Sequence, residues 1–221
     1  GARVAIRMFQ VLVVALGARS ATFGRRIRSF WGRGRVGIIG EYDASLEGIG
    51  LIWYLVDEGT GAETPVGVAS QSLLHCEFGD DSSFQNTVEY MGALLAILGV
   101  IALGYSRREV GLRGDSVSSL QWVKKGKARS ALAMPTAFAH TRVVQREEIM
   151  IQGLDHISGT ENWRADGLSR GKDGRWLADE DPRFQGLPVV GVNWKVWTDL
   201  CDPRQGFDTE EDFIRFWDRM K

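Results

Sequence analysis

Apolar and polar positions divide the chain into segments of two kinds. Short runs rich in β-branched and aromatic residues, bounded by Gly, Asp and Ser, are typical of strands, whereas longer runs with apolar residues every three or four positions are typical of helices. Predicted strands cover residues 36–45, 48–57, 66–74, 108–115 and 149–157. Predicted helices cover residues 82–105, 116–126, 131–148 and 161–171.

The order of these segments is β-β-β-α-β-α-α-β-α. The first three strands have short connections, including a turn-rich loop over 57–65, which predicts an antiparallel meander. The last two strands are separated by helices, as parallel strands are. We therefore expect an α/β architecture, in which a five-stranded mixed sheet of three antiparallel and then two parallel strands is flanked by helices.

The predicted helix over 82–105 is apolar nearly all round and should be buried on most sides. Ser83 or Asn86 could cap its start, and Gly104 could end it. Its uncharged stretch, from Tyr90 to Tyr105, is shorter than the roughly 20 residues that a membrane span needs, so no membrane partner is expected.

Charge is distributed unevenly along the 221 residues. Residues 1–40 hold eight arginines and no acid, whereas residues 41–170 carry a net −6 and residues 171–221 a net −3. A basic arm ahead of an acidic body fits a nucleic-acid partner, and an Arg-rich, acid-poor arm also fits an organelle transit peptide. The two cysteines form no disulfide framework and favour a reducing compartment, cytoplasmic or nuclear.

These patterns divide the chain into three parts. Residues 1–35 form a basic arm or linker, residues 36–171 the α/β domain, and residues 172–221 an acidic, Trp-rich extension. The Trp side chains of the extension could stack on bases, but burial in a small core is the expectation. The start at Gly1 and the acidic tail suggest a segment of a larger polyprotein.

Four acids occupy positions where elements should meet. Asp43 and Asp115 end the first and fourth strands, Glu89 lies on the apolar helix, and Asp166 lies in the last helix. One such acid taken alone is ordinarily a cap or a surface charge. Four acids that converge would repel one another unless cations neutralised them, and two Mg²⁺ ions would satisfy that demand. Two-metal sites serve nucleases, recombinases and polymerases, so the acids leave the reaction class open.

The sequence around these acids resembles the ribonuclease H family (type 1), and most closely the domains that follow reverse transcriptase in retroelements. The resemblance covers about residues 36–171, and its strongest part is HISGTENWRADGLSRG, which ends in Ala-Asp and Leu-Ser-Arg. The motifs YDAS, QNTVE and GDS precede it, and the four acids are 46, 26 and 51 residues apart. The resemblance implies an RNase H-like fold.

The resemblance also implies roles for single residues. Asp43, Glu89, Asp115 and Asp166 match the metal-binding acids, and His156 matches a loop histidine that assists proton transfer or product release. The implied cofactor is a pair of Mg²⁺ ions, with Mn²⁺ as a substitute. The implied reaction is endonucleolytic hydrolysis of the RNA strand of an RNA–DNA hybrid, and a reverse transcriptase in the same polyprotein is an implied partner.

Further polar residues are expected to contact the hybrid. Asn86 and Asn162 fall where the family contacts the backbone and 2′-hydroxyls, although either could be a helix cap. Ser45 and Ser116 are lesser contacts, and Ser116 could equally be a cap. A basic cluster beside Trp122 should hold phosphates, unless it is only a solvated loop. Its members are Lys124, Lys125, Lys127 and Arg129.

Two other functions remain open at this stage. A catalytically inactive RNase H-like module could bind nucleic acid or a polymerase body, although the complete set of acids argues against such decay. An integrase or resolvase would share the wider fold, but the ADGLSR ending and the Asp-Glu-Asp-Asp order disfavour it.

Overall fold

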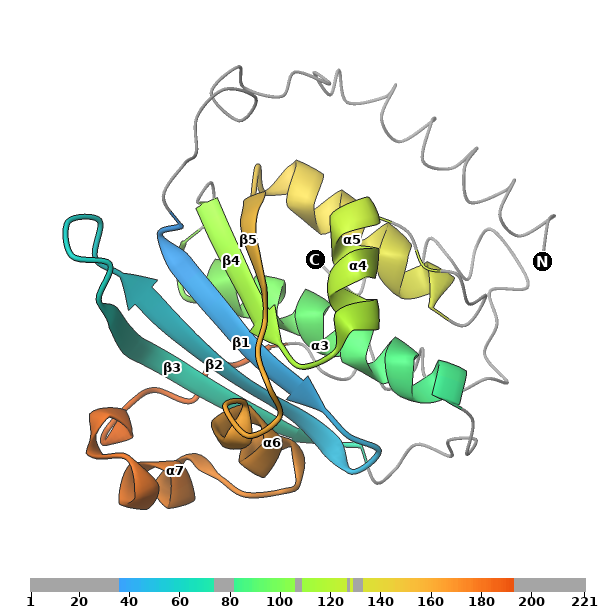
Figure 1. Cartoon of the computed structure of the whole chain (residues 1–221). Helices are drawn as coiled ribbons and strands as arrows, with labels where there is room; N and C mark the ends of the chain where they lie inside the picture. Colours follow the sequence, from blue (N-terminus) through green and yellow to red (C-terminus); the bar gives the residue numbers. More distant parts are fainter. Residues whose placement is uncertain (1–35, 74–81, 106–108, 127, 129–132, 193–221) are drawn as a thin grey trace, which may run out of the picture.

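A single five-stranded sheet forms the centre of the computed structural model (Figure 1). The strand order is β3-β2-β1-β4-β5. β1 pairs antiparallel with β2, and β2 with β3, whereas β1 with β4 and β4 with β5 are parallel. The predicted mixed sheet of three antiparallel and two parallel strands is therefore confirmed. The strand bounds are Ile38–Ala44 (β1), Gly48–Val56 (β2), Glu63–Ser72 (β3), Glu109–Gly114 (β4) and Met150–His156 (β5). The structure describes residues 36–73, 82–105, 109–126, 128 and 133–192.

Helices cover both faces of this sheet (Figure 1). On one face α3, α4 and α5 enclose the larger hydrophobic core. On the other face α6, α7 and a short 3₁₀ helix, η1, enclose a smaller core. β1 lies in the middle and is buried along its whole length, because its side chains enter both cores in alternation. The helix bounds are Ser82–Ala102 (α3), Val117–Lys125 (α4), Met134–Arg146 (α5), Trp163–Ser169 (α6), Gly174–Glu180 (α7) and Pro182–Phe184 (η1).

α3 is buried on most sides, as its apolar sequence predicts. Ala93, Leu94 and Ile97 are fully buried, and Gly104 follows the helix with a φ of 82°. Among the described residues, the stretch Phe84–Ala102 is the one helix whose length and composition would fit a membrane span, and 78% of its most apolar part is buried inside the protein. The helix begins at Ser82, so Asn86 lies inside it and does not cap it.

Trp53 of β2 packs directly on the backbone of α3. Its Nε1 donates a hydrogen bond of 2.8 Å to the Ala96 carbonyl oxygen, and its ring fills the space where Gly99 has no side chain. We expect Gly99→Ala to lower the free energy of unfolding by about 1–3 kcal/mol, because the added methyl overlaps the indole. In an open helix the same change would be stabilising. Urea unfolding measures the effect, with Gly191→Ala, which meets no neighbouring atom, as control. Equal stability of the two variants would contradict this packing.

β3 begins earlier than the sequence pattern predicts. Residues 57–65 were expected to be a loop, yet Glu63, Thr64 and Pro65 belong to the strand. Proline is tolerated here because β3 is an edge strand, and the pairing shifts between Trp53 and Tyr54 at the same level. The loop-like composition of residues 57–65 therefore led to a predicted strand start that is three residues too late.

The chain after α6 remains attached to the sheet as far as the structure describes it. Leu177 and Phe184 are buried in the smaller core. Val68 of β3 donates to the Pro188 carbonyl and accepts from the Val190 amide at 2.8 Å, which covers part of this edge strand. Trp176 is half-buried against Trp163, as burial of the Trp-rich segment predicts. The predicted arm over 1–35 and residues 193–221 lie outside the described residues.

Candidate active site

Three of the four predicted acids meet at one edge of the sheet. Asp43 is near the end of β1 and Asp115 follows β4, and these neighbouring strands run parallel, so both acids emerge on the same side. α3 crosses there and contributes Glu89. Each acid offers a carboxylate oxygen within 4.8 Å of the others. The predicted convergence of these three acids is confirmed, and we call them the acid triad.

Glu89 is buried, as Asp43 is, and it has the higher pKa of the two. Oε1 accepts a hydrogen bond of 3.2 Å from Gln85 Nε2, whereas the buried Oε2 has no partner. Gln85 also donates to the Ala44 carbonyl oxygen, which holds it at the end of β1. Burial raises the pKa of Glu89 to about 9, and the nearby Asp43 and Asp115 charges add to the increase. A buried carboxylate without a partner is costly, so this position favours a bound cation.

Asp43 accepts hydrogen bonds from two side chains, one on α6 and one on the residue just before it. Asn162 Nδ2 donates to Oδ1 at 3.1 Å, and Ser169 Oγ donates to Oδ2 at 2.6 Å. We call Asn162 and Ser169 the Asp43 clamp, because together they occupy both oxygens of the carboxylate. Burial raises the pKa of Asp43 to about 6, and the Ser169 hydrogen bond opposes that increase. The clamp therefore fixes the orientation of the carboxylate, and its two hydrogen bonds partly replace those that water makes to an exposed carboxylate.

Asp115 is half-buried and lies beside the loop that follows β5. Burial is the main cause that raises its pKa, and the charge of Asp166 acts in the same direction. His156, the last residue of β5, is exposed, and its Nε2 lies 3.1 Å from the Asp115 backbone carbonyl oxygen. The predicted histidine thus lies beside the acid triad, at the end of β5, and its role stays a prediction.

Asp166 lies outside the acid triad in this structure. It is on α6 with 38% of its side chain exposed, and its Oδ1 accepts a hydrogen bond of 2.7 Å from Arg170 Nε, one helical turn away. Its charge still raises the pKa values of Asp43 and Asp115, which places it near both. The fourth metal ligand therefore stays a prediction, and it would require Asp166 to turn from Arg170 toward the acid triad.

Several predicted substrate contacts have structural partners instead. Asn162 is fully buried, and its Nδ2 donates to the Tyr42 carbonyl oxygen and to Asp43 Oδ1. Its side chain makes no cap hydrogen bond to α6. Ser116 caps α4 through Ser119 N. Ser45 Oγ accepts a hydrogen bond from the Gly48 amide and donates one to the Ser169 carbonyl oxygen. Their contacts to a hybrid stay predictions, and Asn162 as placed here is not accessible to one.

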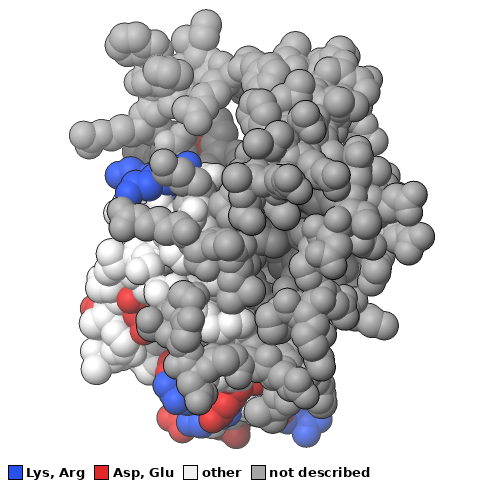
Figure 2. Space-filling model, turned by 90° about the vertical axis from the view of Figure 1, so that its right-hand side faces the viewer, with Lys and Arg blue, Asp and Glu red and all other residues white. Residues whose placement is uncertain are grey.

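The predicted basic cluster is only partly described. Lys124 and Lys125 are exposed in the last turn of α4, and Lys127 and Arg129 lie outside the described residues. In Figure 2 the Lys and Arg side chains visible among the coloured residues form separate groups, and one of these is mixed with acids. Phosphate binding by this cluster therefore stays a prediction.

Ser169 is the site residue that sequence reasoning missed. It is fully buried, and it follows Asp166 by three residues on the same helix. Ser169 belongs to the Leu-Ser-Arg ending of the motif. Its position one helical turn after Asp166 is the sequence signal that could have identified it. Only the approach of α6 to β1 shows which carboxylate it serves.

The acid triad fits a divalent cation by its chemistry. Three carboxylates with raised pKa values lie together, and Glu89 Oε2 is a buried acceptor without a partner. Oxygen ligands of this kind suit Mg²⁺ or Mn²⁺, and a bound cation would favour the ionised form of all three acids.

The Asp43 clamp gives a testable prediction. Ser169→Ala should weaken divalent-metal binding about tenfold, because residues that orient metal ligands typically contribute this much. Mn²⁺ titration by calorimetry measures the affinity, and thermal unfolding reports any loss of stability. Ser70→Ala, an exposed serine on β3, is the control. Unchanged Mn²⁺ affinity in Ser169→Ala would show that the clamp is only structural.

Comparison with known proteins gives similarity at the level of solved structures alone. No protein-family model and no curated protein matches the chain. RNase H1 from Halobacterium salinarum NRC-1 is 20% identical, with a TM-score of 0.41, over 61% of this chain and 94% of that one. LC11-RNase H1, isolated from compost by a metagenomic approach, is 19% identical, with a TM-score of 0.43, over 65% and 99%. The structure of LC11-RNase H1 in complex with an RNA/DNA hybrid is 17% identical, with a TM-score of 0.43, over 63% of this chain and 97% of that one.

Proposed function

We propose that this protein is a ribonuclease H that hydrolyses the RNA strand of RNA–DNA hybrids with divalent metal ions. The observation that carries the proposal is the acid triad, in which Asp43, Glu89 and Asp115 approach within 4.8 Å around an unpartnered buried oxygen. The strand order of the sheet, which is that of the RNase H fold, and the HISGTENWRADGLSRG motif support the substrate assignment.

Each part of the site has a role in this reaction. Asp43, Glu89 and Asp115 would hold the metal, and the Asp43 clamp orients one of these ligands. A divalent ion bound there supplies charge stabilisation at the scissile phosphate and lowers the pKa of an attacking water. We propose that His156, which is exposed beside Asp115, assists proton transfer or product release, as the motif resemblance implies. Asp166 would complete a second metal position after leaving Arg170.

Recognition of a hybrid does not require readout of bases. Hybrids differ from duplex DNA in their 2′-hydroxyls and groove shape. We propose Lys124 and Lys125, which are exposed at the end of α4, as phosphate contacts on one side of the acid triad. The motif resemblance alone supports an origin in a retroelement and a reverse transcriptase as the neighbouring domain.

A substrate panel tests the proposed reaction. The full chain is incubated with RNA–DNA hybrid, RNA duplex and DNA duplex of one sequence, with Mg²⁺, with Mn²⁺ or with a chelator. We expect cleavage of the RNA strand in the hybrid alone, leaving 5′-phosphate and 3′-hydroxyl ends, and none with the chelator. Hybrid binding without metal-dependent cleavage would favour the inactive module, and cleavage of duplex DNA would favour an integrase- or resolvase-like enzyme.

A further inference from the structure

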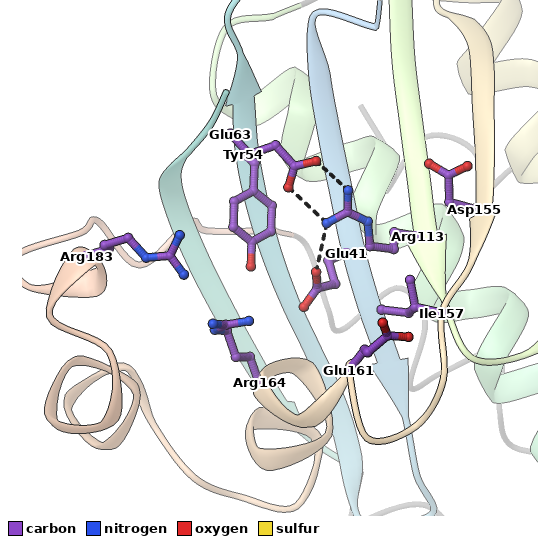
Figure 3. Close-up of a pocket in the computed structure, with 9 residues that line it drawn as sticks. All are labelled: Glu41, Tyr54, Glu63, Arg113, Asp155, Ile157, Glu161, Arg164 and Arg183. Carbon is purple, nitrogen blue, oxygen red and sulfur yellow. Dashed lines mark hydrogen bonds and ion pairs between the residues drawn. The ribbon is translucent and has the colours of Figure 1, made fainter. Parts of the chain in front are cut away.

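A polar pocket of about 510 Å³ lies on the sheet face that carries α6, and the acid triad is not part of its lining. Each of the five strands contributes one side chain to it (Figure 3). The loop after β5, α6 and η1 provide the remaining walls. Its volume lies in the range of small-molecule sites. In sheet order the five side chains are Glu63, Tyr54, Glu41, Arg113 and Asp155.

Each of the three arginines of the pocket has an acid as partner, but Arg164 and Arg183 share one carboxylate. Arg113 forms a two-fold hydrogen bond with Glu63, through Nη1 at 3.0 Å and through Nη2. Asp181 Oδ2 accepts from both Arg164, at 3.0 Å, and Arg183, at 2.7 Å. Each guanidinium group therefore already has a carboxylate partner, while Arg164 Nε is buried without a hydrogen-bond partner.

Glu41 forms the floor and has an unused acceptor. The residue is 3% exposed, and its Oε2 lies 3.5 Å from Arg113 Nη1. Oε1 is buried without a hydrogen-bond partner. Figure 3 shows this carboxylate beneath Arg113, facing the space that Arg164 borders. A buried carboxylate oxygen that lacks a donor is costly, so a ligand with an N–H group would be stabilised here.

Further negative charge lies at the rim. The Asp155 side chain has no hydrogen bond or ion pair with the described residues, and the register Glu41–Arg113–Asp155 places the residue two strands from Glu41. Two strand spacings amount to about 10 Å. With Glu63, Glu161 and Asp181, five carboxylates stand against three arginines.

The arrangement of these acids disfavours a metal ion. Within the described residues, the acid triad is the one group of three acidic or His/Cys residues close enough to share a cation. The pocket acids are spread across the sheet and are interleaved with arginines. An organic cation, which can extend from one acid to another, fits this spacing better than a compact ion does.

We propose that this pocket binds an aliphatic diamine, with one ammonium donating to Glu41 Oε1 and the other directed toward Asp155. An ammonium suits the floor better than a guanidinium does, because a guanidinium fork needs two free carboxylate oxygens and Oε2 faces Arg113. The methylene chain would cross the sheet over Arg113. This binding is independent of nuclease chemistry and goes beyond the proposed function.

Calorimetric titration of the full chain with 1,4-diaminobutane at pH 8, in the presence of a chelator, tests the proposal. We expect saturable 1:1 binding that Glu41→Gln weakens at least about tenfold, since the ammonium loses the negative charge of its acceptor. Asp155→Asn should weaken it severalfold. Glu180→Gln removes one exposed charge outside the pocket and should leave the affinity unchanged. Thermal unfolding shows whether each variant is folded.

A second ligand separates hydrogen bonding from charge alone. Tetramethylammonium carries a positive charge without N–H donors, so it should not bind. Absence of saturable diaminobutane binding, or equal binding by Glu41→Gln, would overturn the proposal. Equal binding of tetramethylammonium would also overturn it, because non-specific attraction would then account for the affinity. Should Glu41→Gln fail to fold, Asp155→Asn, which changes an exposed residue, still decides the question.

Discussion

Replacing Asp115 by Asn is expected to reduce Mg²⁺-dependent hybrid cleavage by about a hundred- to a thousandfold. The amide keeps the size of the side chain but removes the charge from the acid triad. Metal-assisted charge stabilisation contributes several kcal/mol to such reactions, and each 1.36 kcal/mol corresponds to about tenfold in rate. Cleavage of a labelled hybrid under single-turnover conditions measures the loss.

Asp155→Asn provides the matched control for this measurement. Asp155 is an acid on β5 that pairs with Arg113 of β4. Its side chain lines the polar pocket and is not part of the acid triad. Its cleavage rate should remain within about twofold of wild type. Equal cleavage by Asp115→Asn and wild type would show that the acid triad is not the active site. Asp115→Asn should also bind Mn²⁺ more weakly, which links lost cleavage to the metal.

The metal-free protein is expected to lose stability as the pH rises from about 5 to about 9. Burial and the neighbouring acids raise the pKa of Glu89 from 4.5 to about 9 in the folded state. A folded-state pKa above the unfolded value means that the folded protein binds the proton more tightly, so stability is full at low pH and falls as Glu89 ionises. At pH 8 this loss amounts to roughly 3–5 kcal/mol.

Glu89→Gln isolates this effect. The amide cannot ionise, so the variant should be more stable than wild type at pH 8 and nearly equal to it at pH 5. Urea unfolding at both pH values measures the difference. His140, whose pKa burial lowers to about 4, titrates mainly below this window. Mg²⁺ should stabilise wild type at pH 8 and have little effect on Glu89→Gln. A pH-independent difference between the two proteins would contradict the assignment.

The placement of Asp43 and Asp115 was predictable because strand ends are encoded locally. A β-rich run followed by an acid shows where a strand stops, and parallel neighbours bring such stops to one edge. Glu89 was predictable for a different reason, since a single acid on an apolar helix requires a partner. The sequence pattern therefore predicted that these three acids meet, but it also placed Asp166 with them, which pairs with Arg170 instead.

Other features depended on contacts between distant segments. The burial of Asn162 and the hydrogen bond from Ser169 to Asp43 require α6 to pack on β1, whereas the pairing of Asp166 with Arg170 is a rotamer choice within α6. Local sequence leaves several rotamers open to each residue, and packing of α6 on β1 selects among them. The start of β3 at Glu63 had the same origin, because the sheet edge tolerates Pro65.

By itself, the sequence determined the order of elements, the mixed sheet and the three acids at its edge, because hydrophobic period and turn residues act over short distances. The tertiary structure decided how α6 clamps Asp43, where the fourth acid points and that a polar pocket crosses all five strands. The Asp43 clamp arises where segments more than 100 residues apart meet, as in the bond between Ser169 and Asp43. Contacts of that range are set by the packing of whole elements.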